Sequence, residues 1–192
     1  IVLGRGCNAE GGWVTRLKQY WEPQDYYNIV YNLGVPGQMS SDLLKRFNIE
    51  CKARIYFNRK NDRNILIVAI GLNDSRSDHT KIGIFKKNVL KLISLAQKYT
   101  KDVVFVGLTP VDEALAKNYE GTSFSNERVE KFNKVLRRAC ASQKVLFIEI
   151  FDEFMKKDYK TLLDDGIHPN SQGYGKMFRI IKQFLVENGM LR

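Results

Sequence analysis

What this 192-residue chain lacks already excludes several classes of protein. Its three cysteines, Cys7, Cys51 and Cys140, lie far apart without a C-x-x-C pair, so we expect neither a disulfide framework nor a structural zinc site. Two histidines, His79 and His168, are too few for a two-metal hydrolase site. We therefore expect reduced thiols, a cytoplasmic setting, and no metal or organic cofactor.

Long apolar runs are missing as well. No run reaches the roughly 18 residues of a membrane-spanning helix, and the start of the sequence does not resemble a signal peptide. A leader upstream of Ile1 stays compatible with the sequence. No membrane span is expected.

The formal net charge of +10 would attract nucleic acid, anionic surfaces or acidic substrates. The basic residues are scattered, however, and mostly lie on segments with helical spacing, which favours solvated helix faces. There is no RNP-like aromatic motif, zinc-finger spacing or long basic run. Nucleic acid is therefore not an expected partner.

What is present indicates one globular α/β domain over residues 1–192, with a hydrophobic fraction of 44% that suffices for one core. Segments rich in β-branched and aromatic residues predict buried strands, and amphipathic segments between them predict helices. The predicted strands are residues 28–33, 64–70, 102–108 and 144–148. The predicted helices are residues 13–21, 40–47, 82–99, 126–141 and 171–187.

Apolar strands alternating with helices predict a three-layer α/β/α sandwich with a mainly parallel sheet. Such sheets bind ligands at the carboxyl ends of their strands. Polar and glycine-rich turns follow the predicted strand ends at residues 32–37, 71–74, 108–110 and 164–170. The long irregular stretch 109–125 is expected to form a loop near this edge.

Asp165 and His168 lie three residues apart in the last of these turns, between Gly166 and Pro169. A carboxylate placed against the imidazole Nδ1–H would fix the tautomer and let Nε2 act as a general base. The alternative is a turn that caps the helix predicted from Ser171. The spacing alone favours neither interpretation.

Gly34 and Asn73 follow two other predicted strands and could supply hydrogen-bond donors to an oxyanion, one from the backbone and one from a side-chain amide. Each also has a structural explanation. Gly34 could be required by a positive φ, and Asn73-Asp74 could form a helix N-cap or an Asx-turn. Taken singly, each structural explanation is at least as good as the functional one.

Taken together, N-L-G-V-P-G at residues 32–37, G-L-N-D at 71–74 and D-G-I-H-P-N at 165–170 resemble the SGNH, or GDSL-type, hydrolase superfamily. The resemblance spans nearly the whole chain. It implies a flavodoxin-like sandwich and a serine esterase, lipase or other acylhydrolase. It also implies that Gly34 and Asn73 serve the oxyanion hole and that Asp165 and His168 complete a catalytic triad.

The first motif of that family is where this sequence departs from the pattern. Family members carry Gly-Asp-Ser at the end of the first strand, and residues 1–4 followed by E-G-G-W at 10–13 look like what comes directly after it. The nucleophilic serine is therefore expected immediately before Ile1. Since the first strand of such a sheet is normally central, a folded protein should retain it.

Other candidate nucleophiles fit less well. Ser40 and Ser41 fall at a predicted helix start, where capping explains them better, and Ser75 has no matching motif. Cys7 could react only if its pKa were lowered. His79 could contact substrate or a metal, but a solvated loop histidine is favoured, and no G-x-S-x-G motif indicates a standard α/β-hydrolase.

The sequence thus predicts hydrolysis of a small acyl ester through an acyl-enzyme intermediate. Variable loops set the acyl and alcohol specificity, here residues 5–11, 76–81 and 109–125. Tyr119 and Phe124 could line an apolar pocket there or simply pack the loop. The alternatives are an inactive SGNH-fold binding module, a carbohydrate O-deacetylase or a thioesterase.

Overall fold

The computed structural model describes residues 1–4, 11–55, 63–76, 80–156 and 158–191. Contacts within the chain group the residues into two compact units, which are described separately. The first unit contains Ile1–Pro36, Thr109–Asn126 and Ile150–Arg192. The second contains Gly37–Leu108 and Glu127–Glu149.

A parallel sheet forms the centre of the second unit. Its strands are β1 (Ile65–Val68), β2 (Asp102–Val106) and β3 (Leu146–Ile148), in the order β1-β2-β3. Both strand pairs are parallel, and β2 is buried along its whole length. The sequence predicted these three strands, each a few residues longer than observed, because continuous apolar runs are typical of strands covered on both faces.

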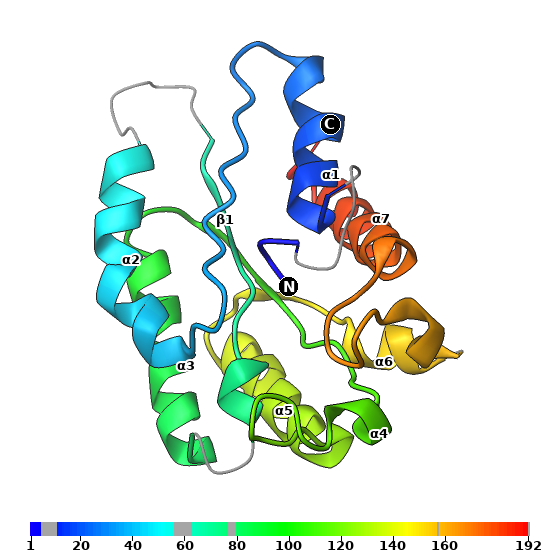
Figure 1. Cartoon of the computed structure of the whole chain (residues 1–192). Helices are drawn as coiled ribbons and strands as arrows, with labels where there is room; N and C mark the ends of the chain where they lie inside the picture. The colour runs from blue at the N-terminus through cyan, green and yellow to red at the C-terminus, as the bar shows by residue number, and fades with distance from the viewer. Residues whose placement is uncertain (5–10, 56–62, 77–79, 157, 192) are drawn as a thin grey trace. The chain divides into compact units, whose positions relative to one another are not determined.

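Three long helices belong with this sheet: α2 (Ser40–Arg54), α3 (Ile82–Ala96) and α5 (Asn126–Ser142), whose first residue is grouped with the first unit. Helices α2 and α3 lie side by side (Figure 1). Phe85 of α3 and Phe132 of α5 are buried with their ring centroids 4.8 Å apart. Helices α2 and α3 thus pack against each other, and a ring contact joins α3 to α5.

Helix α2 continues to Arg54, seven residues beyond the predicted end at Phe47. The reason is that Cys51 lies one turn after Phe47 and is also buried, so the apolar face of the helix extends into the second half. The predicted starts of all five helices agree with the structure.

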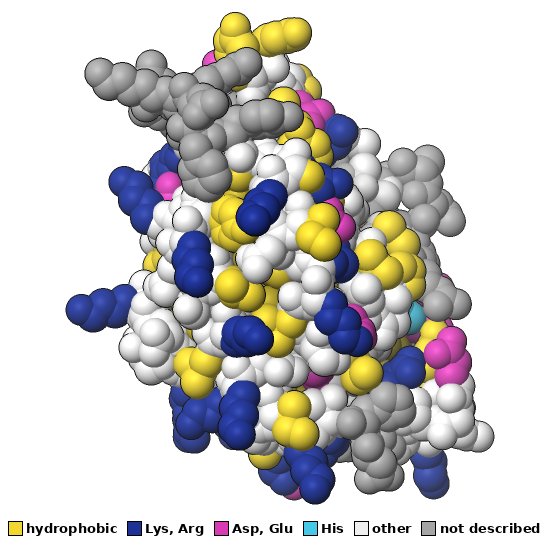
Figure 2. All heavy atoms as spheres, turned by 90° about the vertical axis from the view of Figure 1, so that its left-hand side faces the viewer, with side chains coloured by type: hydrophobic (Ala, Val, Ile, Leu, Met, Phe, Trp, Pro, Cys, Tyr) yellow, Lys and Arg dark blue, Asp and Glu magenta, His cyan; other side chains and the backbone are white. Residues whose placement is uncertain are grey.

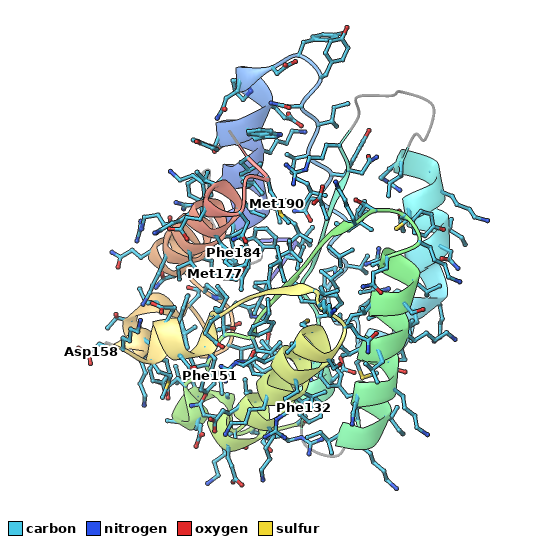
Figure 3. All side chains as sticks on the ribbon, turned by 180° about the vertical axis from the view of Figure 1, so that it is seen from behind. Phe132, Phe151, Asp158, Met177, Phe184 and Met190 are labelled. Atoms are coloured by element: carbon cyan, nitrogen blue, oxygen red, sulfur yellow. The ribbon has the colours of Figure 1, made fainter. Side chains whose placement is uncertain are left out.

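The first unit is built around α1 (Trp13–Trp21) and α7 (Ser171–Glu187), which pack against each other. The Arg16 guanidinium donates to the Ser171 hydroxyl at 2.8 Å and joins α1 to the start of α7. Met177, labelled in Figure 3, lies on the buried face of α7. An apolar stripe at helical spacing thus holds α7 in place.

Short elements complete both units. The short helices α4 (Glu113–Ala116) and α6 (Phe151–Met155) belong to the first unit. Three 3-10 helices are also present: η1 (Glu22–Gln24), η2 (Asn73–Ser75) and η3 (Tyr159–Leu162). The stretch 109–125, predicted as an irregular loop, contains α4 and an antiparallel bridge between Tyr119 and Thr122.

The prediction of a buried strand at residues 28–33 is wrong. This segment forms no strand in the structure, and Ile29 and Tyr31 are 61% and 50% exposed. Its backbone makes a side-chain contact in place of strand pairing, since the Val30 N–H donates to the Glu22 carboxylate at 2.8 Å. An apolar alternating sequence becomes a strand only when another strand pairs with it, and none among the described residues does.

The predicted α/β class with a mainly parallel sheet is confirmed. Among the helices that the structure describes, none is both long enough and apolar enough to cross a membrane.

Candidate active site

The turn that carries Asp165 and His168 connects η3 to α7 in the first unit. Backbone bonds close it at its base, from the Asp164 N–H to the His168 carbonyl at 2.8 Å and from the Asn170 N–H to the Leu162 carbonyl at 2.9 Å. Leu163 and Pro169 form an antiparallel bridge between them. The turn is therefore a closed, hydrogen-bonded loop that fixes the backbone on both sides of His168.

Gly166 lets this loop adopt its shape. Its φ is +86°, and a Cβ atom there would lie 2.6 Å from the Cβ of Leu115. Its carbonyl accepts a 2.8 Å bond from the Asp112 N–H. Only glycine combines this left-handed backbone with so close a neighbour, so the loop rests against the start of α4.

Within the loop, the Asp165 carboxylate contacts His168 through both of its oxygens. Oδ2 lies 2.8 Å from the imidazole Nδ1, and Oδ1 accepts the backbone N–H of His168 at 2.8 Å and that of Ile167 at 3.1 Å. The His168 side chain is 16% exposed. The structure thus brings together the two residues predicted as acid and base.

The turn also caps the helix that follows it, as the alternative explanation predicted, but Asp165 is not the capping residue. The side chain of Asn170 caps α7 instead, because its Oδ1 accepts the Gly173 N–H at 3.0 Å. All the hydrogen bonds of the Asp165 carboxylate described above come from inside the loop. Capping and the contact with His168 are therefore performed by different residues.

The charge of Asp165 determines which nitrogen of the His168 ring carries the proton. Partial burial disfavours the carboxylate, but the bonds from the His168 backbone and ring and from the Ile167 N–H outweigh it and lower the pKa of Asp165. An ionised carboxylate can only accept, so Nδ1 carries the proton. In the neutral ring, Nε2 then holds the free lone pair that a general base needs.

The two residues predicted as possible lining of an apolar pocket, Tyr119 and Phe124, differ in burial. The Tyr119 ring is only partly buried, and its centroid lies 6.1 Å from that of His168. Phe124 is 4% exposed and packs in the core. Tyr119 is thus the residue of this stretch that borders the His168 side chain.

Gly34 lies in the first unit, beside the start of the chain. The prediction that Gly34 is required by a positive φ is wrong, because its φ is not positive. Glycine is required here by close packing, since a Cβ atom would lie 2.6 Å from the Leu3 nitrogen and 3.0 Å from the Val2 carbonyl carbon. Its N–H donates to the Oδ1 of Asn32 at 3.0 Å, and the Asn32 Nδ2 donates to the Val2 carbonyl at 3.1 Å. The predicted backbone donor is therefore present and is paired with a neighbouring amide.

Asn73 lies in the second unit, where it begins η2 after the end of β1. Its side chain caps no helix; the Nδ2 donates to the Gln38 carbonyl at 3.1 Å. An amide nitrogen carries two hydrogens, and only one bond from this nitrogen is formed to the described residues. Gln38 thus orients the Asn73 side chain, and the second hydrogen of Nδ2 forms no bond with a described residue.

Asp74 is a residue whose role the sequence did not predict. It is fully buried, and its carboxylate accepts the Ser40 N–H at 2.8 Å and the Ser40 hydroxyl at 2.5 Å. That hydroxyl also accepts from the Asn88 amide at 2.9 Å. Burial raises the pKa of Asp74 although the bonds from Ser40 oppose the shift. The sequence feature that could have indicated this role is the acidic residue directly after Asn73.

This carboxylate joins the turn that holds Asn73 to the beginning of α2. Ser40 is the first residue of α2, whose leading N–H groups have no partner within the helix. Ser40 was predicted to cap this helix, but its hydroxyl donates to Asp74. Asp74 therefore satisfies one of these N–H groups from a distant part of the sequence, and the Asp42 carboxylate accepts the Met39 N–H beside it.

The remaining candidate nucleophiles divide as follows. Ser75 is fully buried and donates to the Leu72 carbonyl at 2.7 Å. Cys51 and Cys140 are buried, and burial raises their pKa values to about 11 and about 12. Cys7 and His79 lie outside the described residues. Ser75 and the two buried thiols therefore lack the exposure of an activated nucleophile.

In the described parts of the chain, no three His, Cys, Asp or Glu side chains gather as they would around a metal ion.

Solved structures with the same fold include several ester hydrolases. A lipase/acylhydrolase from Enterococcus faecalis has a TM-score of 0.71 and 20% identity, over 85% of this chain and 77% of that chain. An acetylxylan esterase from Geobacillus stearothermophilus has a TM-score of 0.70 and 18% identity, over 96% and 85%. Another acetyl xylan esterase reaches 0.75 at 15% identity, over 94% and 97%. At these identities the similarity establishes the SGNH-hydrolase fold.

No curated protein matches the sequence. The model of one family does match, and it covers residues 1–176, which is most of the chain. This match agrees with the three motifs at residues 32–37, 71–74 and 165–170. The chain belongs to the GDSL-like lipase/acylhydrolase family.

Proposed function

We propose that this protein hydrolyses carboxylic esters by the serine mechanism, with His168 as the general base and Asp165 as the residue that orients it. The base would remove the proton of a serine hydroxyl as the oxygen attacks the ester carbonyl. The protonated ring would then donate to the leaving alcohol. Water, activated by the same base, would release the acid from the acyl-enzyme.

The proposal rests on one observation, the 2.8 Å contact between the Asp165 carboxylate and Nδ1 of His168. Because the carboxylate accepts at Nδ1, the basic lone pair is on Nε2, and the imidazolium formed during attack is stabilised by the adjacent negative charge. The side chain of His168 is 16% exposed, which limits the ways in which the ring can reorient.

Asn73 and Gly34 are the proposed oxyanion donors. Asn73 would use the second hydrogen of its Nδ2 while the first holds the Gln38 carbonyl. The Gly34 N–H would exchange its bond with the Asn32 side chain for one with the oxyanion. Loss of one such donor typically lowers the rate about 10²- to 10³-fold, so Asn73→Ala is expected to fall in that range.

The nucleophile in this proposal is the serine expected immediately before Ile1. It is tested by labelling the full-length protein with a fluorophosphonate, which reacts with activated serines, and by locating the labelled peptide. We expect labelling at that serine and its loss in His168→Ala. A protein that takes up no label under any condition would instead be an inactive binding module of this fold.

The activity itself is tested with p-nitrophenyl acetate and with a panel of other esters, namely an acetylated xylo-oligosaccharide, a phospholipid and an acyl thioester. We expect His168→Ala to reduce hydrolysis of every substrate that the wild type accepts to near background. The circular dichroism spectrum should stay unchanged, because the closing bonds of the loop are between backbone atoms. Normal turnover by folded His168→Ala would overturn the proposal.

A further inference from the structure

Helix α3 and the residues beside it carry lysines that have no acidic partner among the described residues. Lys52 of α2 has none among them either, whereas Lys45 of α2 pairs with Asp42. From Thr80 to Lys101 the sequence contains six lysines and no aspartate or glutamate. Those on the helix and just after it are exposed, and none forms an ion pair with another described residue. Residues 80–101 thus contribute six positive charges with no acidic residue among them.

These side chains are arranged in stripes. On α3, Ile84, Lys87 and Lys91 follow one another at spacings of three and four residues, and Lys98 continues the same line one residue past the helix cap. On α2, Ile49 and Lys52 occupy the corresponding line. We call these six residues the lysine face.

The stripes point away from the core of the second unit. Phe85, Val89 and Leu92 of α3 are completely buried and lie on the opposite side of the helix from the stripe. Phe47 and Cys51 occupy the buried side of α2 in the same way. Since α2 and α3 lie side by side, the two stripes face outward from one layer (Figures 1 and 2).

Apolar side chains are interleaved with the charges. Ile49 is 72% exposed and Ile84 is 51% exposed, and Ile82, beside the face, is 43% exposed. Large aliphatic side chains are costly to keep in water, whereas the lysines around them are not. In Figure 2, yellow apolar side chains lie between dark blue Lys and Arg side chains on this side of α2 and α3.

We propose that the lysine face docks on the surface of an anionic phospholipid bilayer. Isoleucine side chains can enter the boundary between headgroups and acyl chains while lysine stems extend and keep their ammonium groups at the phosphates. Unpaired lysines near such a surface are attracted by its negative potential. A nucleic acid would satisfy the charges but would leave the isoleucines exposed. The arginines of α2, Arg46 and Arg54, are both paired with Glu50.

The test is co-sedimentation of the full-length protein with phosphatidylcholine vesicles, with and without about one third phosphatidylserine. We expect binding that requires phosphatidylserine and weakens with added salt. Lys87→Glu/Lys91→Glu should lower the partition coefficient by about 30-fold or more. Absence of wild-type binding to the anionic vesicles would overturn the proposal.

Matched variants distinguish vesicle binding through the lysine face from binding that depends on net charge alone. Lys117→Glu/Arg138→Glu changes the net charge by the same amount at exposed positions outside α2 and α3, and it should retain most of the binding. Ile49→Ser/Ile84→Ser keeps every charge and should still weaken vesicle binding severalfold. Thermal unfolding of each variant checks that it is folded.

Two further results would count against the proposal. One is equal loss of binding in the control pair, which would show that net charge alone acts. The other is a DNA duplex that binds the lysine face tightly and is insensitive to Ile49→Ser/Ile84→Ser, which would identify a polyanion as the partner. Because binding is measured without catalysis, the result is independent of the proposed esterase activity.

Discussion

The Asp165 carboxylate holds His168 by two routes at once, one oxygen against the ring Nδ1 and the other on the backbone N–H of the same residue, each at 2.8 Å. The carboxylate therefore fixes both the position of the residue in the loop and the tautomer of its ring. These two effects can be separated experimentally, because an amide keeps the shape of a carboxylate but not its ability to accept at both atoms.

The variant that separates them is Asp165→Asn. Its Oδ1 can still accept the backbone bonds, but its NH₂ group would face Nδ1 and favour the wrong tautomer, so kcat should fall by roughly 10⁴-fold. Asp164→Asn, at the adjacent exposed position, is the control and should stay within about twofold. Steady-state kinetics on p-nitrophenyl acetate makes the comparison, and similar losses in both variants would contradict the assignment.

Asp165 should also make stability depend on pH. Its pKa is lowered in the folded protein, so its contribution is present above the ordinary aspartate pKa and is lost as the pH falls through the lowered value. The free energy of unfolding of the wild type, minus that of Asp165→Asn, should therefore shrink from about pH 5 to about pH 3. Urea unfolding across this range measures it; a difference that is constant with pH would argue against an ionised Asp165.

The buried cluster around Asp74 should contribute to stability through Ser40. Ser40→Ala removes the hydroxyl that donates to the Asp74 carboxylate and accepts from Asn88, so unfolding should become easier by about 1.5–3 kcal/mol. The control is Ser41→Ala, one residue along the same helix, with an expected change within about 0.5 kcal/mol. Urea unfolding at pH 7 tests both, and an equal effect of the two substitutions would show that the cluster is energetically unimportant.

Gly166 is expected to be intolerant of any side chain. Gly166→Ala combines a left-handed backbone with a contact of 2.6 Å to the Leu115 Cβ. Gly189→Ala has a φ of +63° with open space around it, so it shows the backbone cost alone, about 1–2 kcal/mol. We expect Gly166→Ala to be less stable than Gly189→Ala by about 1–3 kcal/mol and to lose esterase activity. Equal melting temperatures would refute the close packing described for this loop.

The two described cysteines should be chemically inert. Burial raises the pKa of Cys51 to about 11 and that of Cys140 to about 12, so neither supplies much thiolate at pH 8. In a Cys7→Ser variant, Ellman's reagent should therefore react with no thiol until denaturant is added, and then with two. Rapid reaction of a folded sample would place one of these thiols at the surface.

Much of the fold could be predicted from the sequence because its pattern is locally consistent. The short apolar runs at residues 64–70, 102–108 and 144–148 are rich in β-branched residues, which favours buried strands, and the observed strands lie inside them. The amphipathic segments begin where the helices begin. Segment 28–33 has a similar composition and was predicted wrongly, because a strand also needs a partner, which composition does not specify.

The candidate site, like the fold, could be predicted from the sequence only in part. Sequence alone determined which residue types are available: two histidines, an aspartate three positions before one of them, and Gly34 and Asn73 in turns after predicted strands. It left capping and catalysis equally plausible for Asp165. The tertiary structure assigned the capping of α7 to Asn170 and placed the Asp165 carboxylate against the His168 ring. It also brought Asp74 against Ser40 at the start of α2, 34 positions away in the sequence, and Tyr119 against His168, 49 positions away. Contacts at such separations depend on how the backbone is folded, and local sequence preference does not encode them.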